Sequence, residues 1–177
     1  MLCPSATLPP YNFAPLPLYP PATLPLCYPA TLPVASFRNE FYNRSMKFFL
    51  SYRFTGEDPV KLKPILESIQ KALEARGHTN YCTFEWQSHF RDKKLSNREI
   101  LHHAFAELLG ADVLLAFINS PEKSEGMLLE IGYALGKGKK VYVLIRRGVE
   151  TVFVRAIADR AIEFDKVDEI PALISYL

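Results

Sequence analysis

One carboxylate in this sequence lies where it could react with a bound molecule. Residues 112–118 form a short, nearly continuous apolar run, which is typical of a strand buried on both faces of a parallel sheet. Ser124 then suits a helix N-cap, because its hydroxyl can accept a hydrogen bond from a backbone N–H of the first turn. Glu130 follows one to two turns into that helix, beside the carboxyl end of the strand, where open α/β sheets bind their ligands.

The helix that carries Glu130 is expected over residues 124–137. A lone helical glutamate is most often a solvated surface group, but the place of this one and its flanking glycines favour a nucleophile. Gly126 and Gly132 are expected where two backbones approach closely. The buried face of the helix is predicted from helical spacing, and it consists of Leu128, Ile131, Ala134 and Leu135.

Strands and helices alternate from Met46 onward, and these elements must position Glu130. Such alternation predicts right-handed crossovers and a parallel sheet. We therefore expect an α/β fold, a flavodoxin-like three-layer sandwich with a five-stranded parallel sheet in the order 2-1-3-4-5. The expected strands are residues 47–52, 79–84, 112–118, 140–145 and 161–164, and the expected helices are residues 59–76, 96–109, 124–137, 151–158 and a last one from 167. Residues 85–95 are polar and aromatic, and we expect them to form a loop.

The strand order predicts where a ligand binds. Its switch point falls between the first and third strands, so the loops at residues 53–58 and 119–124 should line the ligand crevice. Ser51 and Arg53 follow the first strand and could hold a phosphate or a sugar. Ser124 and the free N–H groups of its helix N-terminus could do the same. Arg53 has an equally good alternative in an ion pair with Glu57 or Asp58.

Three stretches carry a resemblance to a known family: Arg-Phe-Thr-Gly after the first strand, Ala-Asp-Val-Leu-Leu-Ala at 111–116, and Glu-Gly-Met-Leu-Leu-Glu-Ile-Gly-Tyr-Ala-Leu-Gly-Lys-Gly-Lys-Lys-Val at 125–141. Together they resemble the nucleoside 2-deoxyribosyltransferase superfamily, which includes the 2'-deoxynucleoside 5'-phosphate N-hydrolases. The resemblance covers nearly all of residues 46–177. It implies that Glu130 is the nucleophile that attacks the anomeric carbon, and that Ser124 occupies a position where transferases tend to carry aspartate and the monophosphate hydrolases serine.

This resemblance implies cleavage or transfer at the N-glycosidic bond of a nucleoside or nucleoside 5'-monophosphate. A carboxylate beneath the sugar ring can stabilise the positive charge that develops there or bond to carbon 1. Neither a cofactor nor a metal is expected. A nucleoside or nucleotide and a second copy of the chain are the expected partners, with 81–90 as an interface. The predicted substrate-binding residues are Ser51, Tyr52, Arg53, Gly56, Ser124 and Gly126.

This chain departs from the family pattern at two positions: the residue that protonates the leaving base and the tyrosine that contacts the ring. Family members place an aspartate on the helix before the third strand, where this chain has His102, His103 and Ala104. Either Glu107 or a histidine could then protonate the leaving base. The first strand lacks the ring-contacting tyrosine of the transferases, and Tyr52 could substitute for it.

Two alternative functions come from the same residues. Phe-Phe-Leu-Ser-Tyr-Arg at 48–53 resembles the start of Toll/interleukin-receptor-type domains, some of which hydrolyse NAD with a helical glutamate. The other alternative is a catalytically silent nucleotide-binding or self-assembling module, because a fold does not determine an activity.

Residues 1–45 differ in composition from the rest. Ten of the fourteen prolines precede residue 34, and Ala-Thr-Leu-Pro occurs at 6–9, 22–25 and 30–33. Proline removes backbone donors, so we expect a disordered leader. Translated upstream sequence, with Met46 as the natural start, is favoured over the alternative of a proline-rich docking segment. Removing this leader should leave the melting temperature unchanged. The net charge of +2 does not indicate nucleic acid, no membrane partner is expected, and the three cysteines fit a reducing cytoplasm.

Overall fold

The computed structural model describes residues 45–177, and these form a five-stranded, fully parallel sheet flanked by helices. The leader at residues 1–45 and its boundary fall almost wholly outside the described residues. The strands are β1 (Lys47–Tyr52), β2 (Thr79–Cys82), β3 (Val113–Ile118), β4 (Lys140–Arg146) and β5 (Arg160–Phe164). Their order is β2-β1-β3-β4-β5, so the predicted flavodoxin-like fold and its strand order are confirmed.

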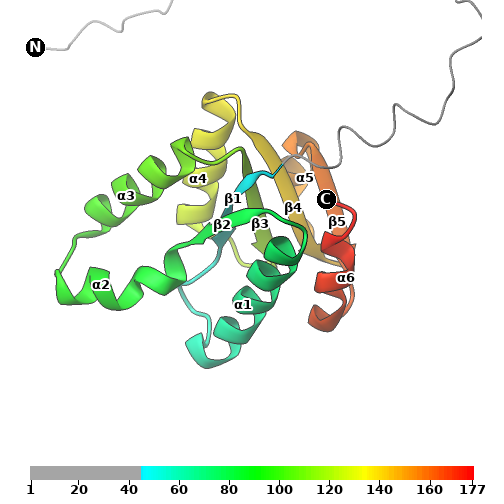
Figure 1. The fold of residues 1–177 in the computed structure, drawn as a ribbon, viewed down its shortest axis with the longest axis horizontal. Helices are drawn as coiled ribbons and strands as arrows, with labels where there is room; N and C mark the ends of the chain where they lie inside the picture. Colours follow the sequence, from blue (N-terminus) through cyan, green and yellow to red (C-terminus); the bar gives the residue numbers. More distant parts are fainter. Residues whose placement is uncertain (1–44) are drawn as a thin grey trace, which may run out of the picture. The chain divides into compact units, whose positions relative to one another are not determined.

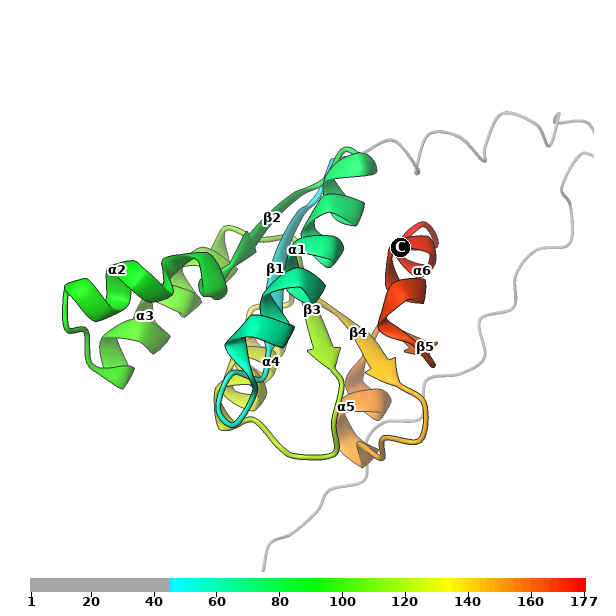
Figure 2. The same cartoon turned by 90° about the horizontal axis from the view of Figure 1, so that it is seen from below.

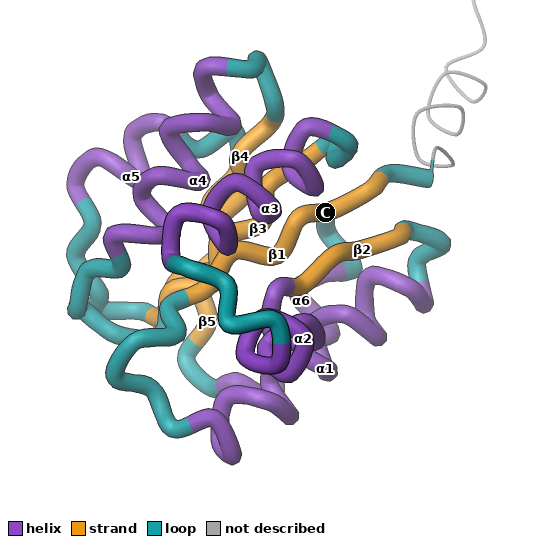
Figure 3. The backbone as a smooth tube through the Cα atoms, turned by 90° about the vertical axis from the view of Figure 1, so that its left-hand side faces the viewer, coloured by secondary structure: helices purple, strands orange, loops and turns teal. Residues whose placement is uncertain are grey.

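Helices cover both faces of the sheet (Figure 1). One face packs against α1 and α6, and the other against α3, α4 and α5, so that the sheet is the middle layer (Figure 3). Among residues 45–177, no helix is both long and apolar enough to cross a membrane. The helices are α1 (Pro59–Ala75), α2 (Gln87–Asp92), α3 (Asn97–Leu109), α4 (Glu125–Gly136), α5 (Val152–Ile157) and α6 (Ile170–Ile174), with short 3-10 turns at Thr83–Trp86 and Val167–Glu169.

Two separate apolar cores follow from the alternation of side chains along each strand. Every residue of β3 is buried, because its side chains point alternately into the two helical layers. In β1, Phe48 and Leu50 pack toward α1, whereas Phe49 packs toward α3 and α4. Ser51 shares the face of Phe49, which sets the direction in which this polar residue points.

Local hydrogen bonds explain where the helices begin. The Asp58 side chain caps α1 by accepting from the Val60 N–H at 2.9 Å. Ser96 and Glu99 form a capping box at the start of α3, in which each side chain bonds the other's backbone N–H. Ser124 caps α4, as predicted, by accepting from the Met127 N–H at 3.3 Å.

The structure corrects the prediction for residues 79–95. β2 ends at Cys82 instead of residue 84, and the expected loop contains a 3-10 turn followed by α2. This segment forms helix because it buries Phe90 and packs Trp86 and His89 together, with ring centroids 5.7 Å apart. Figures 1 and 2 both show α2 beside α3, at the end of the molecule away from β5.

The buried face of α4 also differs from the prediction. Met127, Ile131 and Ala134 are buried, whereas Leu128 and Leu135 are 42% and 40% exposed. Ile131 and Ala134 were predicted correctly, but Leu128 and Leu135 were wrong because the predicted stripe was centred too far round the helix. Positions 127, 131 and 134 share one face at 100° per residue. The close approach expected at Gly126 and Gly132 was also wrong. No described atom lies within 4 Å of where a Cβ would stand at either glycine.

Candidate active site

The centre of the site is a hydrogen bond between β1 and α4. Ser51 is the fifth residue of β1 and is only 1% exposed. Its hydroxyl donates to Glu130 Oε2 over a short distance of 2.5 Å. Glu130 is half-buried as a residue, with its carboxyl turned toward β1, and it lies six positions after the N-cap of α4. The fold thus brings together two predicted site residues that are 79 positions apart in the chain.

Burial sets the ionisation of Glu130. Removal from water raises the pKa of this carboxyl from 4.5 to about 7, and the hydrogen bond from Ser51 offsets part of that rise. None of the ion pairs within residues 45–177 involves Glu130. The carboxyl therefore changes charge near neutral pH, in a place where its negative form has one hydroxyl donor and no cationic partner among the described residues.

The N-terminus of α4 lies at the same edge of the sheet. Ser124 and Glu130 are separated by about 9 Å along the helix axis, at 1.5 Å per residue. Gly126 leaves open space beside the first turn, since no described atom would contact a Cβ there. Free N–H groups and the helix dipole make such a terminus favourable for an anion. The edge thus combines an anion-attracting end with a carboxyl about 9 Å away.

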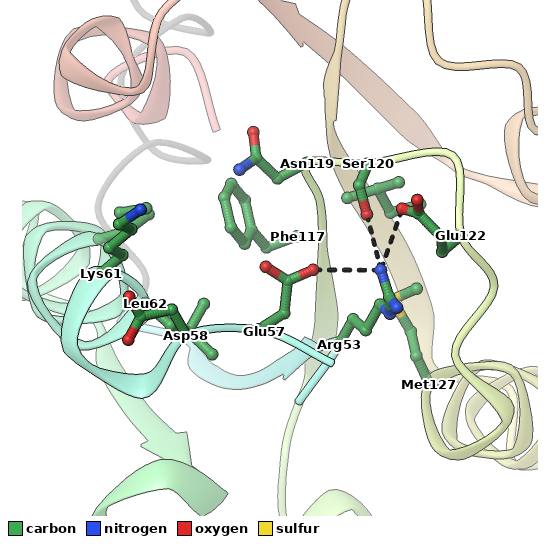
Figure 4. Close-up of a pocket in the computed structure, with 12 residues that line it drawn as sticks. Arg53, Glu57, Asp58, Lys61, Leu62, Phe117, Asn119, Ser120, Glu122 and Met127 are labelled. Carbon is green, nitrogen blue, oxygen red and sulfur yellow. Dashed lines mark hydrogen bonds and ion pairs between the residues drawn. The ribbon is translucent and has the colours of Figure 1, made fainter. Parts of the chain in front are cut away.

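Arg53 joins the two predicted crevice loops, as Figure 4 shows. Its Nη1 donates to Ser120 Oγ at 3.1 Å and pairs with Glu122 at 3.0 Å and with Glu57 at 3.3 Å. These contacts line a cavity of about 210 Å³ above the ends of β1 and β3. Asn119 Oδ1, also in this lining, is buried without a hydrogen-bond partner among the described residues. Arg53 therefore forms the ion pair that was predicted as the alternative to phosphate binding, and its partner is Glu57 and not Asp58.

Two further predicted residues have clear structural surroundings. Gly56 adopts a φ of +82°, which favours glycine, and a Cβ there would lie 2.9 Å from Arg53 Nη2, so a larger residue would also displace the guanidinium. Tyr52 is buried on the α1 side of the sheet, opposite to Ser51, and its hydroxyl accepts from Thr83 Oγ1 at 3.2 Å. Burial raises its pKa well above the usual range. A substrate-binding role for either residue stays a prediction.

A polar pair on the Glu130 side of the sheet was not identified from the sequence. His103 Nε2 and the Tyr81 hydroxyl are 2.8 Å apart, although they come from α3 and β2. Trp86 stacks against Tyr81, with ring centroids 6.3 Å apart. The alternation of β2 could have indicated that Tyr81 points toward α3. The histidine partner depended on how α3 packs, which no local pattern reveals.

Two acidic residues near the site have structural partners. Asp112, just before β3, accepts from the Lys47 N–H at 2.8 Å. Glu107 pairs with Lys47 Nζ at 3.2 Å. Lys47 begins β1 whereas Ser51 is near its end, so this ion pair ties Glu107 to the residue that starts the strand.

Fold and site together define a flavodoxin-like α/β protein with a buried carboxyl at the switch point of its sheet. The family model described as nucleoside 2-deoxyribosyltransferase matches residues 53–159, which is more than half of the chain. The chain therefore belongs to the nucleoside 2-deoxyribosyltransferase family, an enzyme family whose chemistry takes place at the N-glycosidic bond of nucleosides. The matched region includes Ser124 and Glu130 and begins just after Ser51 and Tyr52.

Solved structures show the same fold. A CMP N-glycosidase from Clostridium botulinum is 18% identical with a TM-score of 0.56, and the alignment covers 74% of this chain and 99% of that one. A conserved protein from Enterococcus faecalis is 16% identical, with a TM-score of 0.56 and coverages of 75% and 99%. A 2-deoxyribosyltransferase from Bacillus psychrosaccharolyticus is 17% identical, with a TM-score of 0.52 and coverages of 72% and 95%. No curated protein matches this chain.

Proposed function

We propose that this protein cleaves or transfers at the N-glycosidic bond of a nucleoside or 2'-deoxynucleoside or of its 5'-monophosphate, with Glu130 as the nucleophile or charge stabiliser. The observation that carries the proposal is the buried Glu130 carboxyl, bonded to Ser51 at 2.5 Å and with its pKa raised to about 7. A carboxyl whose charge is destabilised by burial, at a sheet switch point, is typical of functional sites. The family membership and the CMP N-glycosidase fold neighbour support the same chemistry.

The reaction needs a negative charge beneath the sugar. As the C1'–N bond breaks, its electron pair leaves with the base and positive charge builds on the ring. Ionised Glu130 stabilises that charge or forms a C1'–O bond, after which water or a second base attacks carbon 1. The Ser51 hydroxyl holds the reacting oxygen in one position, so little reorganisation is needed during the reaction.

Ser124 supports a phosphorylated substrate. It leaves the α4 N-terminus without a carboxylate side chain at its cap, and the free N–H groups there attract an anion. Ser124→Asp should repel a monophosphate much more strongly than an unphosphorylated nucleoside, because the new charge would lie near the 5' end. Equal weakening of both substrates would contradict the assignment of Ser124 to the phosphate.

We further propose that the protein functions as a homo-oligomer. The outer side of α4 exposes Leu128, Leu129 and Leu135 at 40–53%, and Trp86 is 39% exposed. Several large apolar residues on one surface helix are typical of an interface. Leu129→Glu should shift the chain toward monomer in light scattering at tens of micromolar. Val60→Glu, which changes an exposed residue on α1, is the matched control and should leave the assembly intact.

The test of the main proposal is a substrate screen. The purified chain is incubated with the four common 2'-deoxynucleosides, their 5'-monophosphates and NAD, and the release of free base or nicotinamide is followed chromatographically. Release of base from a nucleoside or monophosphate supports the proposal. Release of nicotinamide alone would favour the Toll/interleukin-receptor-like alternative, and no release from any substrate would favour a silent binding module.

A further inference from the structure

Cleavage of the N-glycosidic bond has a second chemical requirement, and Glu130 does not meet it. The nitrogen that receives the C1'–N electron pair must gain a proton if the base is to leave as a neutral molecule. The donor must lie on the same face of the sheet as Ser51 and Glu130. On this face the Ser51 hydroxyl donates its hydrogen bond to Glu130, and the Glu107 carboxylate is paired with the Lys47 ammonium. Tyr81 and His103 are the pair that meets the requirement.

The register of the sheet places Tyr81 beside the reacting groups. Tyr81 is paired with Phe49 in the parallel β1–β2 ladder, and Ser51 is two residues further along the same face. A strand spacing of about 4.8 Å and a rise of about 6.6 Å over two residues put the two Cα atoms about 8 Å apart, within reach of a tyrosine ring. The Tyr81 ring stacks on Phe49 with centroids 5.6 Å apart and on Trp86 at 6.3 Å. Aromatic contacts on two sides thus hold the phenol in one orientation.

His103 completes the pair from α3. Its Nε2 lies 2.8 Å from the Tyr81 hydroxyl. The imidazole also packs against Trp86 and Phe90, with centroids 5.5 and 5.3 Å away. The histidine is half-buried, so it can exchange protons with solvent while its ring stays fixed. Its neighbour His102 is exposed on the same helix.

We propose that Tyr81 donates the proton that the leaving base takes up, and that His103 acts through Tyr81 by replacing that proton; this rests on the proposed function. In the step, the C1'–N electron pair moves to the base and the Tyr81 O–H proton is transferred to a base heteroatom. Protonated His103 gives its Nε2 proton to the phenol oxygen as the base leaves. Attack of water on carbon 1 later releases one proton, which restores His103.

The charges around Tyr81 suit a proton donor. The carboxylates nearest to it come from three elements: Glu107 on α3, Glu130 on α4 and Glu85 in the 3-10 turn; Cys82 adjoins it on β2. Burial first, and these groups second, raise the pKa of the Tyr81 hydroxyl well above its usual range. The hydroxyl therefore keeps its proton throughout the neutral range and releases it only to a base that is becoming negative.

The decisive test varies the leaving group. Tyr81→Phe removes the hydroxyl and keeps the ring stacked between Phe49 and Trp86. Turnover of the 2'-deoxynucleoside 5'-monophosphate found in the screen should fall about 100-fold or more. Turnover of 4-nitrophenyl 2-deoxyribose 5-phosphate should change less than about threefold, because 4-nitrophenolate leaves without a proton. An equal loss on both substrates, or no loss on either, would overturn the proposal.

The role of His103 is tested by a variant that keeps the hydrogen bond. His103→Gln can still bond the Tyr81 hydroxyl but cannot replace its proton. It should lower turnover of the natural monophosphate about tenfold or more, with KM unchanged and with turnover of the 4-nitrophenyl substrate unchanged. His102→Gln is the matched control and should retain wild-type turnover of both substrates. Wild-type turnover of the monophosphate by His103→Gln, or an equal loss on both substrates, would overturn its part in the relay.

Glu130→Gln separates failure of this inference from failure of the proposed function. It should abolish turnover of both the natural and the 4-nitrophenyl substrate, because it removes the charge beneath the sugar. If Glu130→Gln abolishes both reactions while Tyr81→Phe spares both, the acid assignment fails and the proposed function stands. If the wild-type protein cleaves neither substrate, both are overturned.

Discussion

The Ser51–Glu130 pair and the cluster around Arg53 both begin at the carboxyl end of β1, two residues apart in the chain. Arg53 has two carboxylates and a hydroxyl within 3.3 Å, so its charge is neutralised inside the cluster. Among the described residues Glu130 has the Ser51 hydroxyl as a partner and no cation, and burial raises its pKa to about 7. The two sites lie at the same edge of the sheet, but the charge of Arg53 is neutralised by its neighbours whereas, among the described residues, that of Glu130 is not.

This difference indicates which of the two sites is suited to catalysis. A neutralised arginine gains little from a new partner, because a ligand must first replace the carboxylates that it already has. An unpaired buried carboxyl is unfavourable to the folded state and becomes favourable only when positive charge develops beside it. The Arg53 cluster therefore ties two loops together, and the Glu130 site is the one expected to react.

The largest effect is expected for Glu130→Gln on turnover. The change keeps the size of the side chain and its ability to accept from Ser51, but removes the counter-charge for the developing cation. Turnover on the substrate found in the screen should fall about 100-fold or more, with little change in affinity for a substrate analogue. Steady-state kinetics and analogue titration measure the two quantities. Wild-type turnover in this variant would show that the Glu130 site does not carry the reaction.

The same variant should be more stable than the wild type at alkaline pH. Because the folded-state pKa of Glu130 is raised from 4.5 to about 7, the wild-type fold loses stability as pH rises through this window. Above pH 7, ionisation of the buried carboxyl lowers the free energy of unfolding by at most about 3 kcal/mol. Glutamine does not ionise, so the variant does not lose this stability. Urea unfolding at pH 5 and pH 8 should show a gain for Glu130→Gln chiefly at pH 8. Glu125→Gln, an exposed change on the same helix, should show no such pH dependence.

A smaller effect is expected for Ser51→Ala. The serine hydrogen bond lowers the pKa of Glu130, so its loss should raise that pKa further and leave less of the carboxyl ionised at neutral pH. Turnover near pH 6 should fall about tenfold, and the acid limb of the pH profile should move to higher pH. Ser120→Ala removes the hydroxyl that bonds Arg53 and should leave this limb in place. If the acid limb of the pH profile does not move in Ser51→Ala, the serine has only a packing role.

The smallest effect is expected at the Arg53 cluster. Its ion pairs are partly exposed, so Arg53→Gln should cost at most about 1 kcal/mol of unfolding free energy, less at high salt. Turnover of a monophosphate and of the matching nucleoside should fall by the same small factor. A loss confined to the monophosphate would instead show that Arg53 leaves its carboxylates to bind phosphate, and the contrast between the two sites would disappear.

Most of the architecture was predictable because its signals are local. The apolar run of β3, the Asp58 and Ser124 caps and the alternation of strands with helices each depend on residues close together in the chain. Residues 85–95 were the exception: without a regular apolar period they indicated a loop, and only packing of Trp86, His89 and Phe90 beside α3 makes them helical.

The sequence by itself determined the alternation of strands with helices and the position of Glu130 on α4 after β3, because helical and strand periods and caps act within a few residues. The tertiary structure alone decided that Ser51 meets Glu130 across 79 residues, that Arg53 pairs with Glu122, and that Tyr81 meets His103. These contacts depend on the register between strands and on the face of each helix that packs inward. Burial of the Glu130 carboxyl, and hence its raised pKa, follows from the same packing.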